Sequence, residues 1–98
     1  MSVATTAWDA SGHLDDEAAI AAYLEAALED GDPKLIAAAI GDVARARGIA
    51  QIARDAGLSR ESLYRALSED GNPEFGTVLR VLKALGVRLT VTPNGAAE

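Results

Sequence analysis

Residues 48–67 read GIAQIARDAGLSRESLYRAL, and this stretch decides the fold. In its first half the apolar residues recur at the spacing of one helix face, which predicts a short amphipathic helix; they are Ile49, Ile52, Ala53 and Ala56. Gly57 is expected to end this helix, because glycine adopts a positive φ without steric cost. Ser59 is a suitable N-cap for a second helix. The motif over residues 49–67 therefore predicts a helix-turn-helix.

The second helix of this motif separates an apolar inner face from a polar outer face. Leu63 and Leu67 lie one turn apart and are expected to face inward. The outer positions carry side chains that can donate and accept hydrogen bonds at base edges and phosphates; they are Arg60, Glu61, Ser62, Tyr64 and Arg65. A helix that is only solvated would carry more Glu and Lys paired four residues apart. The outer face therefore favours binding to double-stranded operator DNA.

The formal net charge of −6 is divided unevenly along the chain. Residues 1–32 hold eight Asp and Glu and no Lys or Arg, whereas residues 33–98 hold all nine Lys and Arg against seven Asp and Glu. Within residues 45–65, five Arg oppose only Asp55 and Glu61. Screening acts over about 8–10 Å at physiological salt, so the acidic first third does not prevent DNA binding by the remainder.

The acidic first third favours a basic protein partner instead. We expect carboxylates to provide the charge of this interface and an aromatic residue to provide its apolar anchor. The predicted interface residues are Trp8, Asp15, Asp16, Tyr23, Glu25 and Glu29.

Three further helices are expected around the motif. The first runs from an N-cap at Asp15 to Asp30, the second from Asp32-Pro33 to Gly48, and the last from Glu74 to Leu85. Their apolar stripes predict the faces that contact the core. The expected core residues are Ile20, Tyr23, Leu24, Ala27 and Leu28 in the first, Ile36, Ala39, Ile40 and Val43 in the second, and Phe75, Val78, Leu79 and Leu82 in the last.

The segment after the last helix has a β-type pattern, in which Val87, Leu89 and Val91 alternate with polar residues. No second segment with this pattern exists in the chain, so a strand here would need another copy of the chain across a two-fold axis. The segment therefore predicts a homodimer. The alternative is an extended tail that lies on the last helix without pairing.

The expected fold class is all-α, a five-helix domain with a short C-terminal β-strand. We expect a single domain over residues 14–92, preceded by an N-terminal arm over 1–13 and followed by a disordered tail over 93–98.

The composition argues against several classes of function. The chain has no Cys and one His, so disulfides, thiolate metal sites, a His pair for zinc and a Ser-His-Asp triad are not available. We expect no cofactor, no bound metal and no enzymatic activity. No apolar run of about 18 residues is present, and the N-terminus lacks the pattern of a signal peptide, so a cytoplasmic protein without a membrane span is expected.

From about Trp8 to Leu89, the sequence resembles the addiction-module antidote proteins, HigA-like antitoxins with an Xre-type helix-turn-helix of the lambda-repressor-like fold. The most distinctive pieces of the likeness are YLEAAL at 23–28, DP at 32–33, ARARG at 44–48, LSRESLYRAL at 58–67, DGNP at 70–73 and LKALG at 82–86. The resemblance implies a small RelE/ParE-superfamily (HigB-like) toxin as partner, commonly an mRNA-cleaving one, and repression of the shared operon. It also implies DNA recognition by Arg60, Glu61, Ser62, Tyr64 and Arg65, with Gln51 and Ser59 near the backbone.

Two other readings of the sequence remain open. One is a stand-alone or prophage Xre-type repressor without a toxin, which would need only the domain from Asp32 to Leu85. The other is an interaction module that no longer reads DNA, because the Glu61 carboxylate is repelled by phosphates unless it accepts from a cytosine amino group. A short basic protein encoded in the neighbouring reading frame would favour the antitoxin.

Overall fold

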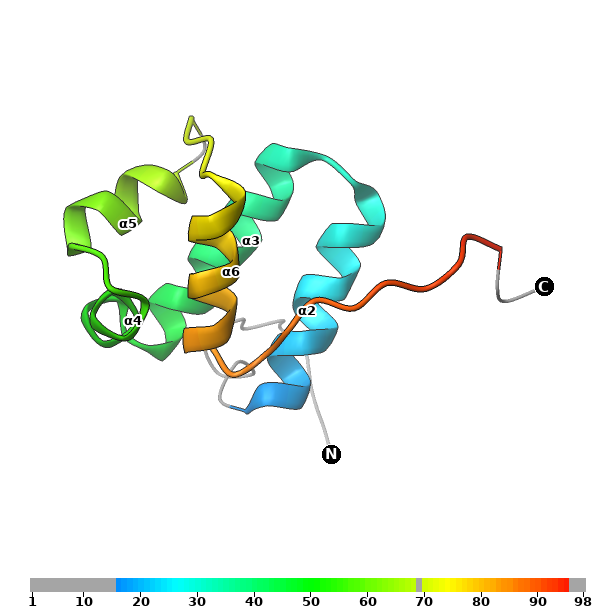
Figure 1. The fold of residues 1–98 in the computed structure, drawn as a ribbon, viewed down its shortest axis with the longest axis horizontal. Coiled ribbons are helices and arrows are strands. Elements are labelled where there is room, and N and C mark those ends of the chain that lie inside the picture. Colours follow the sequence, from blue (N-terminus) through cyan, green and yellow to red (C-terminus); the bar gives the residue numbers. More distant parts are fainter. Residues whose placement is uncertain (1–15, 69, 96–98) are drawn as a thin grey trace, which may run out of the picture.

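The computed structural model describes residues 16–68 and 70–95, which form five helices and no strand (Figure 1). The expected arm over 1–13, Trp8 and Asp15 lie outside the described residues. None of the helices formed by the described residues is long and apolar enough to cross a membrane. The helices are α2 (Glu17–Asp30), α3 (Pro33–Arg47), α4 (Ile49–Ala56), α5 (Arg60–Ala66) and α6 (Phe75–Ala84).

The first two helices begin at carboxylate caps. Asp16, and not Asp15 as expected, caps α2: its Oδ1 accepts from the backbone N–H of Ala19 at 2.8 Å. The prediction was wrong by one residue because both positions carry an acid, and only the backbone decides which of them reaches the unpaired N–H groups of the first turn. Asp32 caps α3 as predicted and accepts from the N–H of Lys34, with Pro33 in the first turn.

One core joins all five helices. Its largest fully buried side chains come from α2, α3, α5 and α6 and from the residues that directly follow α5 and α6; they are Ile20, Val43, Leu63, Leu67, Val81 and Leu85. Ile52 and Ala53 extend the core onto α4. Burying a side chain of this size contributes about 1.5–3 kcal/mol. The core therefore fixes the position of the short helices α4 and α5, which could not persist alone.

Three residues expected in the core are exposed instead. Leu28 near the end of α2 is 43% exposed, Leu79 on α6 is 42% exposed, and Phe75 at the start of α6 is 67% exposed. The buried face of α6 consists of Val81 and Leu82, and Leu85 continues it. Periodicity identifies an apolar stripe but not how much of its length another helix covers, so these predictions were wrong.

The expected strand over residues 87–91 does not form in the described part of the chain. Val87 packs against the core, and its N–H donates to the carbonyl of Leu82 at 3.1 Å. Beyond it the backbone is extended, passes beside α2 and only then leaves the helices (Figure 1), and Val91 is 95% exposed. A β ladder needs a second strand, and the described residues offer none.

Candidate nucleic-acid interface

The α4–α5 unit is two short helices joined by a tight turn, as expected over residues 49–67. Gly57 has φ +75°, and its N–H donates to the carbonyl of Arg54 at 3.1 Å. The next N–H, that of Leu58, donates to the carbonyl of Ala53 at 2.8 Å. Ala53 is buried, so the middle of α4 offers only a methyl group to its neighbours. The turn is therefore fixed by backbone hydrogen bonds and by the small residue beneath it.

Ser59 caps α5 as predicted. Its Oγ accepts from the backbone N–H of Ser62 at 3.0 Å and donates to Ser62 Oγ at 2.9 Å. The two hydroxyls therefore form a hydrogen-bonded pair at the start of α5.

The inner face of α5 is anchored tightly. Leu63 is fully buried and Leu67 nearly so, as predicted. A Cβ at Gly41 of α3 would lie 3.1 Å from the carbonyl oxygen of Leu67, which shows how closely the end of α5 approaches α3. The buried leucines and the close approach of its end to α3 both hold α5 in place. The outer face of α5 therefore stands on a rigid support.

The outer face of α5 consists of exposed polar residues. Ser62 is half-buried, and Tyr64 is 43% exposed. At four exposed positions the side chain forms no hydrogen bond or ion pair with another described residue. These positions are Arg60, Glu61, Tyr64 and Arg65. Their donors and acceptors are therefore available to a partner.

A line of polar contacts runs along the exposed face of α4, and sequence reasoning had singled out only Gln51 in it. Gln51 Nε2 donates to Asp55 Oδ1 at 2.9 Å, and Arg54 Nη1 donates to Gln51 Oε1 at 2.8 Å. In the sequence, the signal for these contacts was the spacing of three and four residues from Gln51 to Arg54 and Asp55, which places the side chains side by side on a helix. These hydrogen bonds fix the orientation of the Gln51 amide, and the remaining N–H donors of Arg54 face solvent.

Arg80 is a cation beside the unit that the sequence did not indicate. It belongs to α6, yet its Nη1 lies 3.9 Å from where a Cβ of Gly57 would stand. Conversely, Arg45 forms an ion pair with Asp42 at 2.7 Å, so part of the positive charge counted over residues 45–65 is neutralised locally. Arg54, Arg60 and Arg65 of the α4–α5 unit are thus joined by Arg80 of α6, and the exposed Arg47 ends α3 just before the unit.

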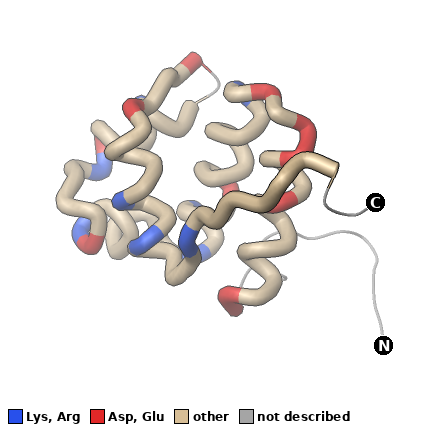
Figure 2. The backbone as a smooth tube through the Cα atoms, turned by 45° about the vertical axis from the view of Figure 1, so that its right-hand side comes forward, with Lys and Arg blue, Asp and Glu red and all other residues tan. Residues whose placement is uncertain are grey.

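Charge is distributed unevenly over the molecule: α2 and its connections are acidic, and the rest of the described chain carries cations and acids together (Figure 2). Six Asp and Glu and no Lys or Arg occur over residues 16–32, which comprise α2 and its connections. Glu25 and Glu29 are exposed on this helix. Eight of the nine cations lie between residues 45 and 88, beyond the start of α3.

Tyr23, expected as an anchor for a partner, lies half-buried against the core. Its hydroxyl donates to Asp42 Oδ2 at 2.8 Å and ties α2 to α3. Burial, and then the hydrogen bond to the negatively charged Asp42, raise the pKa of the Tyr23 phenol above its usual value. The structure thus gives Tyr23 an intramolecular role.

Comparison with known proteins supplies the family. Residues 4–93 match the model of a family described as probable addiction module antidote protein. A protein of Haemophilus influenzae, described only as uncharacterized, is 51% identical over 84 residues, which cover 86% of this chain and 87% of that protein. No solved structure matched the chain. The chain therefore belongs to the family of probable addiction module antidote proteins.

Proposed function

We propose that this chain is the antitoxin of a type II toxin–antitoxin module. In this proposal it neutralises a RelE/ParE-superfamily (HigB-like) toxin by direct binding, and it represses its own operon as a cytoplasmic DNA-binding homodimer without enzymatic activity. Membership of the antidote family supports the antitoxin role and implies a toxin partner. The DNA-binding role depends on the α4–α5 unit, which we infer to be an Xre-type helix-turn-helix.

The outer face of α5 is the observation that carries the DNA-binding role. Arg60 and Arg65 project from a helix whose opposite side is buried, and neither makes an ion pair with another described residue. An Arg guanidinium can donate two hydrogen bonds to guanine O6 and N7 in the major groove. Arg54 at the end of α4 and Arg80 of α6, whose guanidinium lies beside Gly57, are near the turn and suit contacts with phosphates.

The length of α5 supports recognition by a dimer. Seven residues at about 1.5 Å each span roughly 10 Å, which is enough for only a few base pairs. A second copy reading a second half-site about 34–36 Å away would supply the missing specificity. We propose that Val87, Leu89 and Val91 pair with the same segment of the second copy, since the extended backbone after Val87 makes no ladder with other described residues.

Operator binding by variants of α5 tests this proposal. With DNA from upstream of the gene, Arg60→Ala or Arg65→Ala should weaken specific binding by about 1–3 kcal/mol, as measured by fluorescence anisotropy. Lys34→Ala, which removes one positive charge at the start of α3, should bind like the wild type apart from a small electrostatic change. Operator affinities of both Arg variants equal to that of Lys34→Ala would refute recognition by α5.

A further inference from the structure

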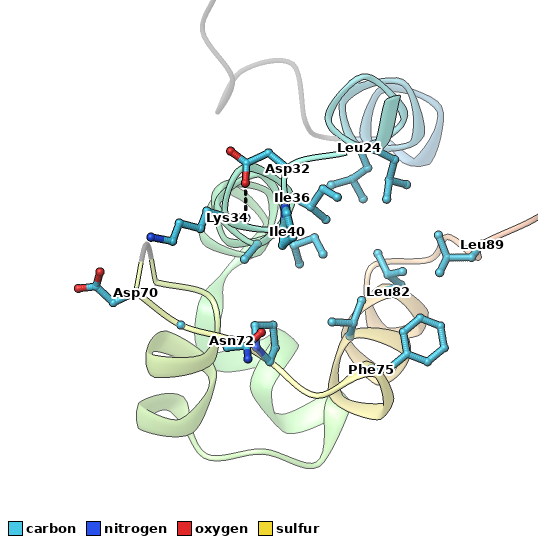
Figure 3. A pocket seen from close by; sticks show the side chains of 16 residues that line it. Leu24, Asp32, Lys34, Ile36, Ile40, Asp70, Asn72, Phe75, Leu82 and Leu89 are labelled. Carbon is cyan, nitrogen blue, oxygen red and sulfur yellow. Dashed lines mark hydrogen bonds between the residues drawn. The ribbon is translucent and has the colours of Figure 1, made fainter. Parts of the chain in front are cut away.

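An apolar hollow of about 560 Å³ opens between α2, α3, α6 and the loop over residues 70–73 (Figure 3). A second hollow, of about 400 Å³, continues from it along α2 and the C-terminal segment. The two share four leucines, and we refer to them together as the α2–α6 groove; the shared residues are Leu24, Leu28, Leu82 and Leu89. No residue that lines the groove belongs to α4 or α5.

The groove contains apolar side chains that the fold leaves in contact with water. Phe75 is 67% exposed, Leu28 is 43% exposed and Leu89 is 37% exposed. Figure 3 shows Phe75 and Leu89 on one side of the hollow, with Ile36 and Ile40 on the other. A contiguous apolar surface of this kind has a hydration cost, and on soluble proteins it commonly marks an interaction site.

The edges of the groove are acidic. Four carboxylates line it, from Glu25, Glu29, Asp32 and Asp70, against the two cations of Lys34 and Arg88. Glu25 and Glu29 lie four residues apart on α2 and have no ion-pair partner among the described residues. Like charges at this spacing destabilise a helix, so helix formation does not account for them. A cationic partner would account for the two carboxylates.

We propose that the α2–α6 groove is the docking site for an amphipathic segment of the toxin, whose apolar side chains fill the groove and whose flanking Lys or Arg meet Glu25 and Glu29. The proposal rests on the antitoxin function proposed above. An amphipathic helix in an apolar groove is a recurrent mode of recognition. A second copy docking over α2 would instead bring Glu25 and Glu29 of both copies together, which disfavours self-association through α2. The pairing proposed for Val87, Leu89 and Val91 runs along the C-terminal segment at the border of the groove.

The α2–α6 groove and the outer face of α5 are separate surfaces. Because the groove uses no residue of α4 or α5, the toxin segment and operator DNA occupy separate surfaces of the chain. Variants of the groove should therefore separate the two kinds of binding.

The test uses the full chain and the purified protein encoded by the adjacent reading frame, with Kd measured by isothermal titration calorimetry. Phe75→Ala and Leu28→Lys should each weaken binding by about tenfold or more. Leu79→Ala on α6 and Leu35→Ala on α3 are matched controls, since both leucines are similarly exposed, at 42% and 44%, and neither lines the groove. The controls should stay within about twofold of the wild type, and all four variants should keep wild-type operator affinity.

The possible failures are distinguishable. If the wild type binds the adjacent gene product and the two groove variants bind it equally well, the groove is not the docking site and the antitoxin function stands. If the wild type does not bind it, the proposed function itself fails, and with it this inference. If sedimentation equilibrium shows that Phe75→Ala loses self-association but keeps toxin binding, the groove is an interface between copies of the chain.

Discussion

The α4–α5 unit and the α2–α6 groove are both made from helices that pack on one core, yet they offer opposite surfaces. The unit buries Leu63 completely and exposes cations such as Arg60 and Arg65. The groove leaves Phe75 and Leu28 in water and places carboxylates beside them. One surface suits a polyanion, and the other suits an apolar partner with positive charge. The difference shows that one small core can support two surfaces of opposite preference.

Removal of the C-terminal segment should give the largest effect and should separate the two surfaces. Deletion of residues 90–98 removes the exposed Val91 together with Thr90 and Thr92, which line the outer part of the groove, but keeps Leu89. If this segment links two copies, the operator affinity should fall by about tenfold or more, because the second half-site is then no longer held at high effective concentration. Sedimentation velocity should show a shift toward monomer. The Kd for the toxin should change by less than in Phe75→Ala, because the deletion keeps Leu28, Phe75 and Leu89 in the groove.

A Val91→Ala variant with wild-type chain length serves as the milder companion of the deletion. It should bind the operator with an affinity between those of the deletion and the wild type. A truncated protein that remains a dimer with unchanged operator affinity would contradict the role assigned to Val91.

Charge reversal should act on the groove and leave the DNA-binding surface unchanged. In Glu25→Lys/Glu29→Lys, two carboxylates beside the groove become cations, so association with a basic toxin should slow by about tenfold at low salt, with a weaker salt dependence. Stopped-flow fluorescence measures the association rate, and co-expression with the toxin should show less protection of growth.

Glu61→Lys is the matched reversal on α5. It should alter operator binding and leave the association rate with the toxin unchanged. If the double reversal associates as fast as the wild type and with the same salt dependence, the acidic face of α2 is only solvated, and the stand-alone repressor without a toxin becomes the better reading.

The two surfaces also differ in how well the sequence predicted them. The turn at Gly57 and the cap at Ser59 depend on neighbours within a few residues, so local patterns were sufficient. The exposure of Phe75 and Leu28 depends on which helices cover the ends of α6 and α2, and a stripe that faces the core has the same spacing as one that faces a partner. Arg80 reaches Gly57 only through the packing of α6 against α4, which no local pattern encodes.

The smallest expected effect concerns the hydrogen bond that holds α2 in place beside the groove. Tyr23→Phe removes the hydroxyl that donates to Asp42 at 2.8 Å. A hydrogen bond to a charged group that is partly open to solvent contributes about 1 kcal/mol, so the free energy of unfolding in urea should fall by about that amount. Asp42 keeps its ion pair with Arg45, which limits the loss. Operator binding should not change, because this hydrogen bond joins α2 to α3 and involves no residue of α4 or α5.

The same hydrogen bond should make stability depend on alkaline pH. The pKa of Tyr23 is raised in the folded protein, chiefly by burial and then by the hydrogen bond to Asp42. The neutral phenol is therefore favoured by folding, so its contribution is complete below the unfolded-state pKa of about 10 and is lost as the pH rises through the higher folded-state pKa. Between pH 8 and pH 11, the free energy of unfolding of the wild type should fall more steeply than that of Tyr23→Phe. Equal slopes for the wild type and Tyr23→Phe would show that neither burial nor Asp42 holds the phenol in its neutral form.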